Sequence, residues 1–178
     1  MFGLFKSKTP EVSISDQIWL YQQSKWNACV KMAEANSQCI FVAWFPKTKT
    51  ELSEFFKVHG VNSPILSARD LTASSENGLL IFVEHYPLSE VEQELFLRLG
   101  LNKVPVLSSL DEPLFSMFGG EKSIQLMKKM GMNDDEIVSH PMITKSIRNA
   151  QRKIAGSVQV ELKADSQEEW LKKNSKEV

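Results

Sequence analysis

Four short apolar runs, separated by segments of helical periodicity, constrain the fold of this chain more than any other feature of its sequence. The runs span residues 39–45, 63–68, 78–84 and 103–107. Runs of this length that are rich in β-branched and aromatic residues are typical of strands buried on both faces of a sheet. One intervening helix is predicted to begin at Thr48 or Thr50, and a second begins at Ser89, with Glu92 in capping-box position. The alternation predicts an α/β fold, with a parallel or mixed sheet and helices on both of its faces.

The segments outside this alternation are predicted to be mostly helical. Residues 16–36 repeat apolar side chains at spacings of three and four, which predicts a helix. The second half predicts a helical C-terminal extension with helices over residues 112–118, 121–130 and 141–154. Alternating apolar residues over 157–162 predict an edge strand. Asp165 or Ser166 then begins a last short helix that carries Trp170.

A length of 178 residues fits one domain. We expect a flexible N-terminus over residues 1–12, a single domain over 13–164, and a short helix and tail over 165–178. The apolar run within residues 1–8 is too short for a signal peptide, and no stretch approaches the ~20 apolar residues of a membrane span. These features predict a cytoplasmic protein. Its N-terminus is expected to be frayed, with weak contact to a membrane surface as the alternative.

The net charge, the cysteines and the histidines limit the kinds of partner and site that the chain can have. A net charge of −1 disfavours a nucleic-acid partner. Cys29 and Cys39 lie inside apolar patterns without metal-ligand spacing, which predicts free buried thiols rather than a disulfide or a zinc site. His85 follows Glu84 at the end of a predicted strand, where α/β proteins often place ligand sites. A hydrogen-bonded loop histidine is the alternative.

Three consecutive motifs in the second half resemble a known family. Residues 107–120 read LSSLDEPLFSMFGG, residues 124–131 read IQLMKKMG, and residues 140–153 read HPMITKSIRNAQRK. In the same order, they resemble segments that end the second RecA-like motor domain of SecA, the ATP-driven motor of bacterial protein export. Weaker similarity extends the resemblance to residues 25–155. It implies a shortened RecA-like domain of the P-loop-NTPase type, in the setting of protein export.

The chain departs from that family where the family performs its chemistry. A motor of this kind uses a Gly-rich loop and a lysine on one domain, and arginines on the other. None of the eight glycines lies in a G-x-x-x-x-G-K-[ST] pattern. In residues 94–101, which resemble the family's arginine-rich helix, only Arg98 keeps its charge, while Phe96 and Leu101 replace arginines. The resemblance therefore implies no catalytic residue, no cofactor and no metal. It leaves a vestigial nucleotide face of Glu84, His85, Glu94 and Arg98.

Two surfaces are candidates for binding a protein. One is the face on which the absent first motor domain would dock. The other is a basic stretch that contains Lys128, Lys129, Lys145, Arg148 and Arg152. A solvated helix face is the simpler interpretation of these charges. The helix over 141–154 also carries an apolar stripe of Ile143, Ile147, Ala150 and Ile154.

We therefore predict a non-hydrolysing module that binds a protein, with the export machinery as the context that the resemblance implies. Two rivals remain open. One is a residual nucleotide-binding domain anchored on Arg98 and His85, and the other is a structural domain that associates with itself.

Overall fold

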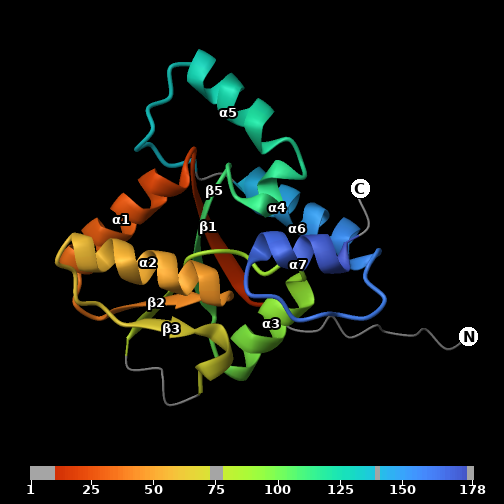
Figure 1. Cartoon of the computed structure of the whole chain (residues 1–178), viewed down its shortest axis with the longest axis horizontal. Helices are drawn as coiled ribbons and strands as arrows, with labels where there is room; N and C mark the ends of the chain where they lie inside the picture. The colour runs from red at the N-terminus through yellow and green to blue at the C-terminus, as the bar shows by residue number, and fades with distance from the viewer. Residues whose placement is uncertain (1–10, 73–77, 139–140, 176–178) are drawn as a thin grey trace, which may run out of the picture.

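A five-stranded sheet lies at the centre of the computed structural model, which describes residues 11–72, 78–138 and 141–175 (Figure 1). The strands are β1 Ser13–Trp19, β2 Cys39–Ala43, β3 Ile65–Ser67, β4 Leu79–Phe82 and β5 Lys103–Ser109. They lie in the order β1-β5-β4-β2-β3, and every neighbouring pair is parallel. This confirms the predicted α/β fold and shows that the sheet is parallel throughout. The predicted flexible N-terminus falls outside the described residues up to position 10.

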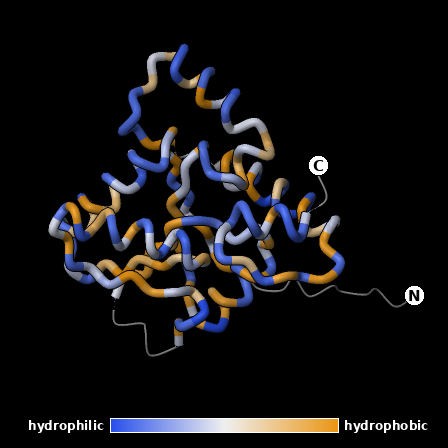
Figure 2. The backbone as a smooth tube through the Cα atoms, viewed as in Figure 1, coloured by the Kyte–Doolittle hydropathy of each residue, from blue (hydrophilic) through white to orange (hydrophobic). Residues whose placement is uncertain are grey.

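Helices cover both faces of the sheet. They are α1 Gln22–Ala35, α2 Pro46–Val58, α3 Ser89–Arg98, α4 Pro113–Ser116, α5 Gly120–Lys129, α6 Pro141–Ala155 and α7 Gln167–Asn174, with a 3₁₀ turn at Ala68–Asp70. Side chains that alternate along β2 enter two different cores. Phe41 packs in the core that α1 and α2 cover, whereas Val42 packs in the core that contains Phe96 of α3 and Trp170 of α7. The strands of the sheet are largely hydrophobic, while hydrophobic and hydrophilic residues alternate along the helices (Figure 2).

The connections diverge between β2 and β4. β2 continues through α2 to β3 on one side, and β4 continues through α3 to β5 on the other. The carboxyl ends of β2 and β4 therefore flank a topological switch point, which residues 44–46 and 83–88 surround.

The predicted helix over residues 16–36 is wrong in its first part. Residues 13–19 form β1, and the helix begins only at Gln22. β1 pairs with β5 over its whole length, from Ser13 opposite Lys103 to Trp19 opposite Ser109. This partner lies about half the chain away, so tertiary pairing overrides the local spacing of apolar residues.

Two smaller predictions are also wrong. Residues 157–162 form no strand, and Val160 is 75% exposed. Instead, the Glu161 carboxylate accepts hydrogen bonds from the Tyr86 hydroxyl and from Trp170 Nε1. The capping box of α3 does not form, because the carboxylate of Glu92 turns inward to His85 and Tyr86.

The helix α5 stands away from the sheet, at the top of the view in Figure 1. It packs against α4, while α6 packs against β1 and α3. In the ranges that the structure describes, no helix combines the length and the apolar character that crossing a membrane requires.

Candidate functional site

Four of the helices that begin at the carboxyl edge of the sheet border one cavity. These are α1, α2, α4 and α7. Helix N-termini favour anions, and a switch point between parallel strands is a common place for a ligand. A cavity of about 230 Å³ lies at this edge, and its walls include Lys25, Thr48, Glu84 and Glu112. A phosphate-binding site would therefore be expected here.

The carboxylate of Glu84 already occupies the anion position at the start of α2. Its Oε1 accepts hydrogen bonds from the backbone N–H groups of Trp44 at 2.9 Å and Phe45 at 3.0 Å. Its Oε2 accepts the hydroxyl of Thr48 at 2.7 Å. Burial raises the pKa of Glu84 to about 7, against the hydrogen bond from Thr48, which lowers it. The donors that could hold a phosphate oxygen are therefore bound to the chain itself.

At each of the other three helix starts, an oxygen of the chain accepts one backbone N–H group. Asp111 Oδ2 accepts the N–H of Gln22, the first residue of α1, at 3.1 Å. Gln167 Oε1 accepts the N–H of Leu114 in α4 at 2.8 Å. Ser166, confirmed as the cap of α7, accepts the N–H of Glu169 at 3.1 Å. The edge is thus closed by internal hydrogen bonds.

Lys25 is a buried cation beneath this edge that the sequence interpretation did not select as a site residue. It is 1% exposed, forms an ion pair with Glu112, and donates to the Val83 carbonyl at 2.7 Å. Glu112 also accepts the Ser109 N–H at 3.0 Å. Lys25 therefore ties α1 to the ends of β4 and β5. In the described residues, no three His, Cys, Asp or Glu side chains converge as metal ligands.

His85 lies between two carboxylates. Its Nε2 is 2.8 Å from Asp16 Oδ1 of β1, and its Nδ1 is 2.9 Å from Glu92 Oε1 of α3. Burial opposes protonation, but the charges and hydrogen bonds of Glu92 and Asp16 outweigh it and raise the pKa of His85 to about 10. Both ring nitrogens therefore donate, and the ring is an imidazolium.

Further hydrogen bonds extend this cluster into α6. Thr144 donates to Asp16, and Gln151 donates to Glu92 Oε2 at 2.9 Å and to the Tyr86 carbonyl at 2.7 Å. His85 is therefore a centre that holds β1, α3 and α6 together. Both of its ring nitrogens are engaged, which leaves neither for a substrate.

The four residues of the predicted nucleotide face lie in two places. Glu84 and His85 are buried together at the carboxyl edge of the sheet. Glu94 and Arg98 are exposed on α3, which runs back toward the amino edge. Arg98 is the last of ten residues in this helix, about 15 Å from its start. The structure therefore does not bring Arg98 to Glu84 and His85.

The predicted basic surface spans two helices. Lys128 pairs with Asp134 at 2.5 Å, and Arg148 pairs with Glu11 at 2.6 Å. Arg152 donates to Asn149 within α6, while Lys129 and Lys145 are exposed. Lys128 and Lys129 belong to α5, and the other three belong to α6.

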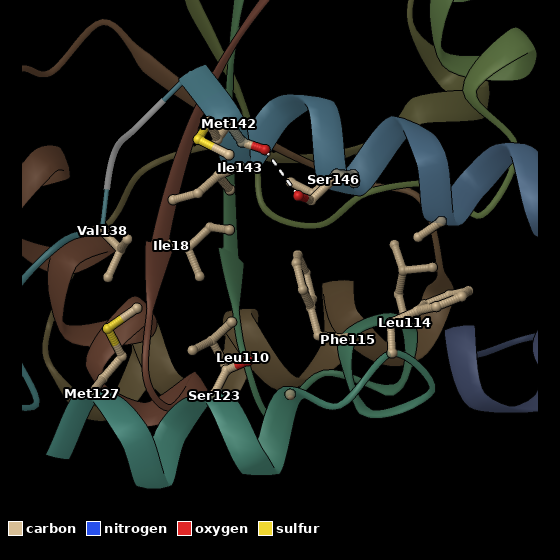
Figure 3. A pocket seen from close by; sticks show the side chains of 14 residues that line it. Ile18, Leu110, Leu114, Phe115, Ser123, Met127, Val138, Met142, Ile143 and Ser146 are labelled. Atoms are coloured by element: carbon tan, nitrogen blue, oxygen red, sulfur yellow. Dashed lines mark hydrogen bonds between the residues drawn. The ribbon is translucent and has the colours of Figure 1, made fainter. Parts of the chain in front are cut away.

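An apolar groove lies between these two helices (Figure 3). This α5–α6 groove has a volume of about 350 Å³. Its walls come from α4, α5, α6, the end of β1 and neighbouring loops, and include Ile18, Phe115, Met127, Val138, Ile143 and Ile147. Figure 3 shows Met127, Phe115 and Ile18 pointing into the space between α5 and α6.

The two helices that line the groove also expose large apolar side chains to solvent. Leu126 is 57% exposed, Met130 is 74% exposed and Met142 is 69% exposed. Ser123 and Ser146 are the polar side chains among the lining residues, and the Ser146 hydroxyl donates to the Met142 carbonyl at 2.9 Å. Of the three exposed apolar side chains, that of Met142 lines the groove itself. Exposed large apolar side chains of this kind are typical of interaction sites.

The sequence interpretation identified the stripe on α6 but not the groove. Ile143, Ile147 and Ala150 line the groove, whereas Ile154 is fully buried in the core. The apolar residues Leu126, Met127 and Met130 on the preceding helix were the available signal. Their place opposite α6 depends on the intervening loop, which sequence spacing does not define.

Comparison with known proteins confirms the resemblance over part of the chain. The SecA protein translocase subunit of Acidithiobacillus ferrooxidans is 38% identical over 79 residues, which cover 42% of this chain and 9% of that protein. SecA 1 of Alkaliphilus metalliredigens is 36% identical over 81 residues, and SecA of Sorangium cellulosum is 38% identical over 82 residues. Each of these two matches covers 43% of this chain.

The matched stretch is shorter than the predicted 25–155, and it makes up less than a tenth of the length of each of these relatives. No family model matches the chain. The comparisons thus identify a SecA-like region within an α/β domain.

Proposed function

We propose that this chain, which is similar to SecA over 42–43% of its length, is a non-hydrolysing module of protein export that binds another protein through the α5–α6 groove. It acts in the cytoplasm. The observation that carries the proposal is the groove itself, with Met127 at its floor and Met142 at its mouth.

The groove has the properties of a site for a partner helix. Its walls are mostly apolar side chains of helices, and an apolar groove of this kind can take the apolar face of an amphipathic helix. Methionines such as Met127, Met130 and Met142 are flexible and adapt to different apolar surfaces. Burial of one such exposed side chain contributes about 1.5–3 kcal/mol.

The carboxyl edge supports the absence of hydrolysis. Glu84 accepts the N–H groups of Trp44 and Phe45 before α2. Oxygens of Asp111, Gln167 and Ser166 each accept one N–H group at the starts of α1, α4 and α7. A nucleotide phosphate would have to displace these groups and approach the carboxylate of Glu84. Arg98, the one retained arginine of the resemblance, lies at the other end of α3.

Retention of export proteins by groove variants tests the proposal. Met142→Gln removes an apolar group that lines the groove and is 69% exposed, so folding should be unaffected. Val58→Gln on α2 is the matched control, because Val58 is 83% exposed and lies outside the groove. Wild type, Met142→Gln and Val58→Gln are immobilised, and the proteins retained from a lysate are quantified by mass spectrometry.

We expect a translocon component or an exported precursor to be retained by wild type and by Val58→Gln. Its retention on Met142→Gln should fall about tenfold, as the loss of roughly 1.4 kcal/mol predicts. Equal retention of that protein on all three, or retention of no export protein, would contradict the proposal.

A further inference from the structure

The two helices that form the α5–α6 groove are rich in basic residues. α6 contains four basic and no acidic residues. α5 contains three basic residues, with Glu121 as its single acidic residue. The whole chain has a net charge of −1, so these two helices are basic relative to it. The acidic residues Asp134, Asp135 and Glu136 lie in the loop between them.

Two of these cations are engaged by acidic residues of the chain itself. Lys128 pairs with Asp134, and Arg148 pairs with Glu11. These two cations are therefore engaged within the chain, and Lys128 also lies over the ring of Tyr21.

The remaining lysines of these two helices are exposed to solvent. On α5, Lys122 and Lys129 lie four residues before and three residues after the exposed Leu126, so they flank it on the helix surface. On α6, Lys145 and Lys153 lie three residues after the groove residues Met142 and Ala150. The ammonium of Lys153 is 5.9 Å from the ring centroid of Phe118, which lines the groove.

We propose that the α5–α6 groove binds an amphipathic helix of a partner protein in which acidic residues flank the apolar ridge. This inference rests on the proposed function and names the chemistry of its partner. The apolar lining of the groove would bury the apolar ridge of the partner helix. The partner's acidic flanks would face a collar of exposed lysines on α5 and α6, namely Lys122, Lys129, Lys145 and Lys153. Charges at the rim of an interface set orientation and association rate, so they select among partners with equal apolar ridges.

The length of the groove limits the length of the apolar ridge that a partner helix can place in it. α5 has ten residues and is about 15 Å long, which corresponds to about three helical turns. A partner would therefore anchor with apolar residues at positions i, i+3, i+4 and i+7. A helix satisfies its own backbone hydrogen bonds, as a site made of apolar side chains requires.

The test uses two synthetic helical peptides with one apolar ridge and opposite flanks. One carries Glu and the other carries Lys at the flanking positions, and binding to the full chain is measured by fluorescence anisotropy. We expect the Glu peptide to bind about tenfold more tightly at low salt. The difference should shrink as salt screens the rim charges between about 0.05 and 0.5 M.

Charge-reversal variants locate the effect. Lys145→Glu combined with Lys153→Glu should abolish the preference for the Glu peptide, with an unchanged melting temperature. The matched control combines Lys31→Glu and Lys57→Glu, two exposed lysines of α1 and α2. This control should keep the preference.

The outcomes separate this inference from the proposed function. If both peptides bind equally and Met142→Gln weakens both, the acidic partner is excluded while the groove remains a protein-binding site. If neither peptide binds but vesicles that contain phosphatidylglycerol do, the collar recognises lipid and the inference is overturned. If neither peptides nor vesicles bind, the inference is overturned, and retention of export proteins alone decides the proposed function.

Discussion

His85 carries a positive charge inside the molecule. The His85 side chain is 1% exposed, and its ring nitrogens donate to Asp16 of β1 and to Glu92 of α3. A buried ion pair contributes little net stability, but removal of one partner leaves an uncompensated charge. His85 is therefore expected to matter for folding rather than for chemistry.

Substitution of His85 should destabilise the protein strongly. His85→Gln leaves two buried carboxylates with no cation between them, and should lower the free energy of unfolding by about 3–5 kcal/mol. Urea denaturation measures the change. His59→Gln is the matched control, since His59 is exposed at the end of α2 and should change stability by less than about 0.5 kcal/mol. Equal effects of the two substitutions would refute the structural role of His85.

The contacts of His85 with Asp16 and Glu92 also predict how stability depends on pH. Because the pKa of His85 is raised from 6.5 to about 10, its contribution is fully present below pH 6.5 and is lost as the pH rises through 10. Glu84, with a pKa raised to about 7, changes stability mainly below pH 7. Burial raises the pKa of Cys29 from 9.0 to about 12, which affects wild type and His85→Gln alike and cancels in their difference. The stability difference between wild type and His85→Gln should shrink as the pH rises towards 10 in urea titrations. A difference that stays constant from pH 7 to 10 would contradict the assignment.

At the same scale, the sequence indicated which residues lie at the strand end but not what they do. Glu84 and His85 follow β4, which ends at Phe82, two residues before the predicted strand end at Glu84. Their partners Thr48 and Asp16 are 36 and 69 residues away. The contact between His85 and Asp16 requires β1 to lie in the sheet. Because residues 16–36 were predicted to be a helix, this contact could not be predicted.

Among the elements, β1 shows why local periodicity misled. Ser13–Trp19 alternates in part between exposed and buried positions, yet Trp19 and the following Leu20 are both buried. The apolar spacing continues without interruption into α1, so strand and helix merge into one pattern. Only the register with β5 decides between them. The remaining strands have apolar runs of their own and were predicted within a few residues.

The position of α5 depends on one glycine. A Cβ at Gly120 would lie 2.1 Å from the Leu110 carbonyl oxygen, so Gly120→Ala must displace α5 or the β5–α4 loop. We expect Gly120→Ala to lower the free energy of unfolding by about 1–3 kcal/mol in thermal or urea denaturation.

Gly156→Ala provides the control for this prediction. A Cβ at Gly156 would lie 3.5 Å from the Lys153 carbonyl oxygen, an ordinary contact, so stability should change by less than about 0.5 kcal/mol. A Gly120→Ala protein as stable as Gly156→Ala would show that α5 is not held by this close approach.

For the molecule as a whole, the structure separates two surfaces that could have served a motor. The carboxyl edge of the sheet is closed by Glu84 and by the caps of three other helices. The α5–α6 groove is open and apolar. Sequence motifs predicted the fold and the resemblance to SecA. The hydrogen bonds at the carboxyl edge and the α5–α6 groove could not be predicted from the sequence, because each is built from segments far apart in the chain.

Amide hydrogen exchange tests most directly whether the chain binds protein at the groove and leaves nucleotide unbound. Deuterium uptake is measured for the chain alone, with Mg-ATP, and with the export protein retained by wild type. The account predicts slower uptake over residues 120–129 and 141–155 with the protein, and unchanged uptake over 44–48 and 84–92 with Mg-ATP. Protection of 44–48 and 84–92 by Mg-ATP, with α5 and α6 unaffected by the protein, would contradict it.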